Sequence, residues 1–121
     1  MRYMMLIYSQ EKEVAAEDMN SVAAQHKLLM DEARRLGILL AADPLQASST
    51  ATTLRIQNGT ALVTDGPYAE TKEQLAGYYI LECQDLDEAL AWAAKIPTVC
   101  AGGSGCIEIR PIREFSVAVN G

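Results

Sequence analysis

The sequence contains little of what metal sites and nucleic-acid-binding surfaces require. It has a single histidine, His26, and its three cysteines, at positions 83, 100 and 106, form no CxxC pair. We therefore expect no structural zinc site, and we predict no metal or other cofactor. Ten Lys and Arg residues stand against 16 Asp and Glu residues, which leaves a net charge of −6. This charge argues against nucleic-acid binding, because phosphate contacts need clustered basic side chains.

Long apolar runs are also absent. The N-terminal run has only about seven apolar residues before the sequence turns polar, too few for a membrane span or a signal sequence. We therefore expect a cytoplasmic protein with reduced thiols and no membrane contact. No GxGxxG, P-loop, GxSxG or HExxH motif occurs, which argues against nucleotide-binding and common hydrolase functions. The length of 121 residues predicts one globular domain over residues 1–121.

The first half of the chain alternates strand and helix patterns. Residues 3–8 form a continuous apolar run, typical of a strand covered on both faces. Over residues 17–36, apolar side chains recur every three or four positions, which predicts an amphipathic helix that ends at Gly37. Residues 38–41 predict a short strand that ends at Asp43-Pro44. The expected buried stripe of the helix consists of Met19, Val22, His26, Leu29, Ala33 and Leu36.

The middle of the chain carries the clearest turn signal. Residues 51–57 and 60–64 flank Asn58-Gly59, which predicts a β-hairpin with a type I′ turn. A loop over residues 66–74 follows, with at most one helical turn at its end, and then a strand over residues 77–83.

Asp85 is the expected N-cap of a second helix, with Glu88 at its third position and Pro97 beyond its end. Residues 101–105 predict a flexible connection, and residues 106–112 predict a final strand with Ile107 and Ile109 inward. Cys83 and Cys106 fall in the expected strands and are predicted to be buried. The expected buried stripe of the helix consists of Leu86, Leu90, Ala93 and the nearby Ile96.

This order of elements fits an α+β fold, a ferredoxin-like split β-α-β unit with an inserted β-hairpin. Both helices are then expected to cover one face of the sheet. The strands over residues 3–8 and 78–81 are apolar on both faces. We therefore expect a homodimer in which the uncovered sheet faces pack together.

Four segments resemble the DGPF-domain branch of the YCII-related family. They are TDGPYAETKEQLAGYY at residues 64–79, RYMMLIY at residues 2–8, the helix segment at residues 85–97, and IEIRP at residues 107–111. Tyr68 stands where the motif has Phe, so an aromatic residue is kept. The resemblance implies the dimeric α+β barrel fold, in agreement with the order of elements.

The resemblance also implies candidate functions. Some relatives are dehalogenases or lyases that use a histidine with an acidic partner and no metal. Members of the DGPF branch resemble domains encoded beside, or joined to, extracytoplasmic-function sigma factors. In the wider family the candidate catalytic histidine stands on the first helix, eleven residues before the glycine that ends it, and His26 and Gly37 have this spacing.

His26 and Asp65 are the candidate catalytic pair, and each has a structural alternative. His26 is either a general acid–base or a histidine packed against the sheet. Asp65 either orients the imidazole or forms an Asx-type turn in which Gly66 and Pro67 set the dihedral angles. Asp43 is a second candidate partner for His26. The loop residues Gly66, Pro67 and Tyr68 are candidates for a pocket wall.

Two functions follow from these candidates. The first is binding of a small organic molecule in a helix–sheet pocket, with metal-independent, His-based lyase or dehalogenase-like chemistry as its catalytic form. The second is a non-catalytic regulatory module that contacts a sigma factor. An exposed loop over residues 65–74 with no adjacent cavity would favour the second function.

Overall fold

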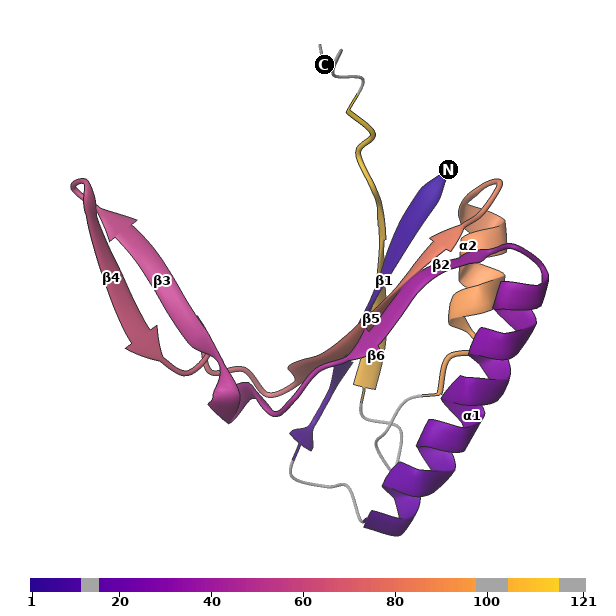
Figure 1. Ribbon diagram of the computed structural model, residues 1–121, viewed down its shortest axis with the longest axis horizontal. Helices are drawn as coiled ribbons and strands as arrows, with labels where there is room; N and C mark the ends of the chain where they lie inside the picture. Colours follow the sequence, from indigo (N-terminus) through magenta and orange to yellow (C-terminus); the bar gives the residue numbers. More distant parts are fainter. Residues whose placement is uncertain (12–15, 98–104, 116–121) are drawn as a thin grey trace.

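The computed structural model describes residues 1–11, 16–97 and 105–115 (Figure 1). A four-stranded sheet is formed by β1 (Arg2–Ser9), β2 (Leu39–Pro44), β5 (Gln74–Glu82) and β6 (Gly105–Pro111). Its order is β2-β5-β1-β6, and every neighbouring pair is antiparallel. β5 therefore lies between β1 and β2, as the predicted split β-α-β unit requires. The predicted α+β fold with a ferredoxin-like arrangement is confirmed.

Both helices, α1 (Ala16–Arg35) and α2 (Leu86–Ala93), lie on the same side of this sheet (Figure 1). Alternate residues of β1 point to this side and are buried, because successive side chains of a strand face opposite ways. The core between helices and sheet contains Tyr3, Met5 and Ile7 of β1, Leu29 and Ala33 of α1, Tyr79 and Leu81 of β5, and Ala89, Trp92 and Ala93 of α2.

Local sequence signals set the ends of both helices as predicted. Gly37 has φ +73°, and the amide of Ile38 donates to the carbonyl of Ala33 at 2.8 Å, which closes the C-terminus of α1. At the start of α2, the carboxylate of Asp85 accepts a hydrogen bond from the amide of Glu88 at 2.9 Å. Each end thus satisfies backbone groups that a helix leaves without partners.

The predicted hairpin forms a separate two-stranded sheet. A short 3₁₀ helix, η2 (Ser48–Thr50), leads into β3 (Thr52–Gln57), which pairs with β4 (Thr60–Asp65). Asn58 and Gly59 have φ of 50° and 77°, as a type I′ turn requires. The hairpin extends from one side of the molecule, at the opposite end from α1 (Figure 1).

Three predicted burial patterns are wrong. Leu86 and Leu90 of α2 are 51% and 49% exposed, because α2 packs through Ala89, Trp92 and Ala93 instead. Leu36 is also exposed, since it lies beyond the last residue of α1. Cys106 is exposed, whereas Cys83 is buried as predicted.

The loop before β5 is shorter than predicted. β5 begins at Gln74, which pairs with Ser9, and residues 71–73 contain no helical turn. The predicted burial of Met19 and residues 101–104 of the predicted connection over 101–105 lie outside what the structure describes, and Gly105 belongs to β6 instead. The final strand β6 alternates as predicted, with Ile107 and Ile109 on the helix side.

The opposite face of the four-stranded sheet has an apolar centre. β1 contributes Met4, Leu6 and Tyr8 to this face, and β5 contributes Tyr78 and Ile80. All five side chains are partly buried, and neither α1 nor α2 lies on this side. Within the described residues, no helix is both long enough and apolar enough to span a membrane.

Candidate functional site

His26 lies between α1 and the sheet, where its ring contacts two other elements. Its Nδ1 atom is 2.5 Å from the hydroxyl oxygen of Tyr79 on β5. The backbone carbonyl of Pro97, beyond α2, accepts a hydrogen bond from the ring. His26 therefore links α1, β5 and the segment that follows α2.

These partners define the protonation of the imidazole. A neutral ring has one N–H donor and one acceptor nitrogen. Because the Pro97 carbonyl can only accept, we assign the ring proton to that contact and assign Nδ1 as the acceptor from Tyr79. Burial lowers the pKa of His26 below its ordinary value, against the hydrogen bond to Pro97, which raises it. Burial raises the pKa of Tyr79 to about 12, so its hydroxyl keeps its proton.

Asp65 lies far from this pair within one chain. It is the last residue of β4, is exposed and pairs in register with Thr52, on the hairpin that extends away from α1 (Figure 1). Its carboxylate makes no hydrogen bond or ion pair with another residue that the structure describes. The Asx-type turn cannot form, because the residue two positions on is Pro67, which has no amide hydrogen.

Asp43 has a different partner from the predicted one. Its Oδ2 atom accepts a hydrogen bond from the hydroxyl of Tyr78 at 2.7 Å. Tyr78 and Tyr79 are consecutive in β5, so their side chains point to opposite faces of the sheet. Asp43 therefore lies on the open face, whereas His26 lies on the helix face.

The loop after Asp65 is fixed to the hairpin by backbone contacts. Gly66 has φ +96°, a conformation that favours glycine, and its amide donates to the carbonyl of Ala51 at 2.7 Å. The carbonyl of Gly66 accepts from the hydroxyl of Thr53 at 2.8 Å. The carbonyl of Tyr68 accepts from Nη2 of Arg55 at 3.2 Å, while the Tyr68 side chain is 75% exposed.

This loop borders a large cavity, which we call the hairpin crevice. Its volume is about 1250 Å³, and it is lined by residues 45–54 and 67–75 together with Tyr8, Gln10 and Glu11. Pro67 and Tyr68, two of the predicted wall residues, line it. Tyr8 and Leu75 pair across β1 and β5, so the crevice lies at one end of the open sheet face.

A series of hydrogen bonds holds the walls of the hairpin crevice together. The carboxylate of Glu11 accepts from the backbone amide and the hydroxyl of Ser48, at 2.6 and 2.9 Å. The amide of Glu11 donates to Oε1 of Gln74 at 3.1 Å, and Nε2 of Gln74 donates to the carbonyl of Thr71 at 2.7 Å. The polar residues of the TKEQ segment thus build the crevice wall.

Two side chains beside the hairpin crevice keep their protons. Burial, followed by the nearby carboxylate of Glu108, raises the pKa of Tyr8. The pKa of the exposed Cys106 thiol is also raised, by slight desolvation and by its hydrogen bond to Glu73, at 3.6 Å between Sγ and Oε2. A protonated thiol is a poor nucleophile, so this environment does not favour covalent chemistry at Cys106.

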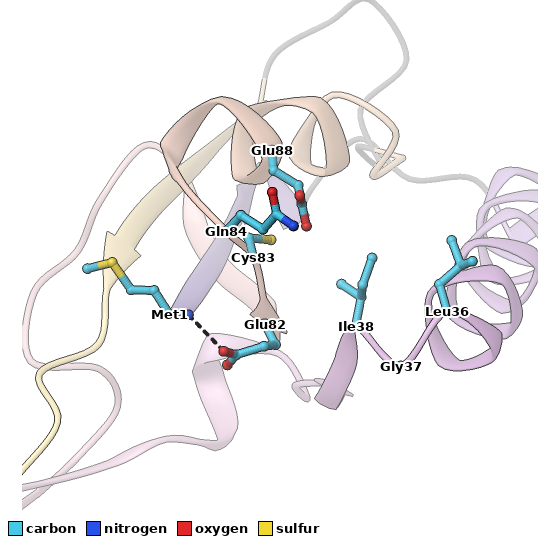
Figure 2. Close-up of a pocket in the computed structure, with 8 residues that line it drawn as sticks. All are labelled: Met1, Leu36, Gly37, Ile38, Glu82, Cys83, Gln84 and Glu88. Carbon is cyan, nitrogen blue, oxygen red and sulfur yellow. Dashed lines mark hydrogen bonds and ion pairs between the residues drawn. The ribbon is translucent and has the colours of Figure 1, made fainter.

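A second, smaller cavity of about 400 Å³ lies at the other end of the sheet (Figure 2). Its walls come from Met1, the turn after α1, the end of β5 and Glu88 of α2. The N-terminal ammonium of Met1 is 2.7 Å from Oε1 of Glu82, so the positive group of this cavity is already paired. No aromatic side chain lines it, which makes it the weaker candidate for an organic ligand. Neither cavity is lined by His26 or Tyr79.

Comparison with known proteins places this geometry in a family. The family model described as the YCII-related domain matches residues 1–116. The chain belongs to the YCII-related family. It is also 38% identical to an uncharacterised protein of Rhizobium meliloti (strain 1021), over 122 residues that cover 95% of this chain and 94% of the relative. The YCII-related resemblance predicted from the sequence is thus confirmed.

Several residues of this YCII-related domain matter at the site but were not predicted. The contact of Tyr79 with His26 was not predicted, although an alternating strand places every second residue toward the helices. Glu11 and Gln74 carry no local signal, because they meet only when β1 pairs with β5. Among the described residues, no three His, Cys, Asp or Glu side chains form a group that could hold a metal ion.

Proposed function

We propose that the protein binds a small organic molecule in the hairpin crevice. The observation that carries this proposal is that the signature loop over residues 67–75 lines a cavity of about 1250 Å³. An exposed loop without a cavity would have favoured the sigma-factor module, so the presence of the crevice favours ligand binding. The sequence predicted a site between helix and sheet, and we now propose a site at the junction of hairpin and sheet instead.

The chemistry of the walls narrows the class of ligand. Tyr8, Tyr68 and Leu75 offer apolar and aromatic surface, and the hydroxyl of Ser49 and the amide of Gln46 offer polar contacts. The ionisable carboxylates are those of Glu11, Glu70 and Glu73, against the single ammonium of Lys72. These walls favour a neutral or cationic organic molecule over an organic anion.

We also propose that the protein forms a homodimer through its open sheet face. Met4, Leu6 and Ile80 form the apolar centre of the open sheet face, and a contiguous apolar patch of this kind marks an interaction surface. A second copy that packs its own open face there would remove these side chains from water. Sedimentation equilibrium of the purified chain tests this part, with a mass of twice 13.1 kDa expected.

Ligand binding is tested by screening a library of neutral and cationic aromatic fragments with ¹⁵N-labelled protein. We expect fragments to shift the backbone amide signals of Tyr68, Thr71 and Gln74, because these residues line the crevice. Anionic analogues of the same fragments serve as the matched ligand control and should bind more weakly. Shifts that gather around Glu82 and Glu88, or no shifts at all, would contradict the proposal.

A second candidate is metal-independent acid–base chemistry at His26, favoured by its contact of 2.5 Å with Tyr79. A neutral imidazole can accept a proton that the Tyr79 hydroxyl passes from a substrate. The test uses carbonyl-bearing fragments in D₂O, with deuterium incorporation next to the carbonyl followed by NMR. His26→Gln should abolish incorporation while circular dichroism shows that the fold is kept. Equal incorporation in both proteins would remove this candidate.

A further inference from the structure

The β3–β4 hairpin has one apolar face that no other described part of the chain covers. Its register pairs Leu54 with Val63 and Ile56 with Ala61, so these four side chains share a face, the arm face. Leu54, Ile56 and Val63 are 60%, 66% and 65% exposed. The other face of the hairpin carries Thr53, Arg55, Gln57, Thr60, Leu62 and Thr64.

The polar face of the hairpin is the one that is fixed to the rest of the chain. Thr53 donates to the carbonyl of Gly66, and Arg55 donates to the carbonyl of Tyr68. Both donors lie opposite the arm face, because the side chains of β3 alternate. The hairpin is therefore fixed to the signature loop through its polar face, and of the arm-face residues only Leu54 also lines the hairpin crevice.

The size of the arm face limits what can cover it. A two-stranded hairpin is at best marginally stable in water when its apolar face is bare. Six residues on each of two strands give a face of about 20 Å by 10 Å, so two arm faces supply about 400 Å². A stable interface buries about 1,200 Å² or more. A partner that contacted only the arm faces would therefore bind weakly.

The open sheet face supplies the missing area. Four strands of about seven residues measure about 23 Å by 19 Å, or about 440 Å² for each copy. Two sheet faces and two arm faces together reach about 1,300 Å², within the range of stable interfaces. Asp65, at the base of the hairpin, is the one charged residue on the arm face. The arm face therefore offers almost no opposite charges to a highly charged partner. A second copy of this chain supplies a matching surface for both faces, because a twofold interface uses the same surfaces on both subunits.

We propose that the β3–β4 hairpin packs its arm face against a second copy of this chain. The inference rests on the homodimer proposed above, and it adds a contact that sheet-to-sheet packing does not require. Leu54 belongs both to the arm face and to the wall of the hairpin crevice. The second copy therefore borders the crevice at the base of the hairpin.

The experiment compares two double variants of the full chain by sedimentation equilibrium. Ile56→Glu with Val63→Glu places two carboxylates on the arm face, and Gln57→Glu with Thr64→Glu places two on the opposite face of the same strands. We expect the arm-face variant to raise the dimer dissociation constant by about 100-fold and the control to change it by less than about threefold. Circular dichroism of both variants checks that the fold is kept.

A milder variant covers the case in which the two carboxylates unfold the chain. Ile56→Ala with Val63→Ala removes apolar area without adding charge, and we expect a dissociation constant about tenfold higher. A dimer as tight as wild type in this variant and in the glutamate variant overturns the arm contact and leaves the sheet-to-sheet dimer standing. A wild-type chain that is monomeric at about 100 μM overturns both contacts, whereas ligand binding in the crevice is decided separately by the fragment screen.

Discussion

The Nδ1 atom of His26 lies 2.5 Å from the hydroxyl oxygen of Tyr79, although 53 positions of sequence separate the two residues. The contact joins the helix layer to the central strand β5, and the ring of Tyr79 is itself part of the core. Because His26 is the chain's single histidine, its ring signal in an NMR spectrum needs no further assignment. The consequences of the contact can therefore be measured directly.

Replacing Tyr79 with Phe should destabilise the protein. The variant keeps the buried ring but removes the donor to Nδ1 of His26, which leaves a half-buried acceptor without a partner. We expect the free energy of unfolding to fall by about 1–2 kcal/mol in urea denaturation. Tyr78→Phe is the matched control, because the hydroxyl of Tyr78 donates to the exposed Asp43 on the other face of the sheet. This variant should lower the free energy of unfolding by less than Tyr79→Phe does. A control at least as destabilised as Tyr79→Phe would contradict the role of this contact.

The same contact predicts how stability depends on pH. Burial lowers the pKa of His26 in the folded chain below 6.5, its ordinary value. Between the folded and unfolded pKa values the unfolded chain binds more protons, so stability rises with pH in this window. The contribution of His26 is complete above about pH 6.5 and is lost as the pH falls toward the folded pKa. An NMR titration that gives His26 a pKa above 6.5 would overturn this prediction, and His26→Gln should flatten the pH dependence of stability.

Replacing Asp65 with Asn tests whether this carboxylate reaches His26 of the same chain. β4 and α1 lie at opposite sides of the folded molecule (Figure 1). We therefore expect the pKa of His26 to change by less than about 0.2 units. A carboxylate in hydrogen-bond contact would stabilise the charged ring, and its loss would then lower the pKa by about one unit. A drop of that size in the NMR titration would restore Asp65 as the partner of His26.

Gln74→Glu tests the wall of the hairpin crevice. The glutamate still accepts from the amide of Glu11, but it cannot donate to the carbonyl of Thr71. We expect faster hydrogen–deuterium exchange of the amides over residues 68–73 and weaker binding of neutral fragments. Gln57→Glu adds the same charge on the hairpin, outside the crevice, and should leave both unchanged. Equal exchange rates in the two variants would show that Gln74 does not hold this wall.

Features set by a few neighbouring residues could be predicted from the sequence. Asn58-Gly59 needs only its own positive φ angles to make the hairpin turn, and Asp85 needs only the amide of Glu88. Local chemistry could also have excluded the Asx-type turn at Asp65, since Pro67 has no amide hydrogen. The error there was in the interpretation of the residues.

Features set by distant packing could not be predicted in this way. Leu90 follows Leu86 by four positions in α2, and Trp92 follows Ala89 by three, so both spacings fit a helix. Only the shape of the core decides that Trp92 is buried and Leu90 is exposed. The partner of His26 depends on how β5 aligns beneath α1, and the contact of Glu11 with Gln74 depends on the pairing of β1 with β5. The crevice is likewise formed by segments that are separated along the chain.

The most direct measurement of the proposed function is a crystal structure of the protein with the tightest-binding fragment. We expect the fragment in the hairpin crevice, against the rings of Tyr8 and Tyr68 and near the side chain of Gln74. A fragment bound instead against His26 and Tyr79, or in the cavity beside Met1 and Glu88, would contradict the proposal.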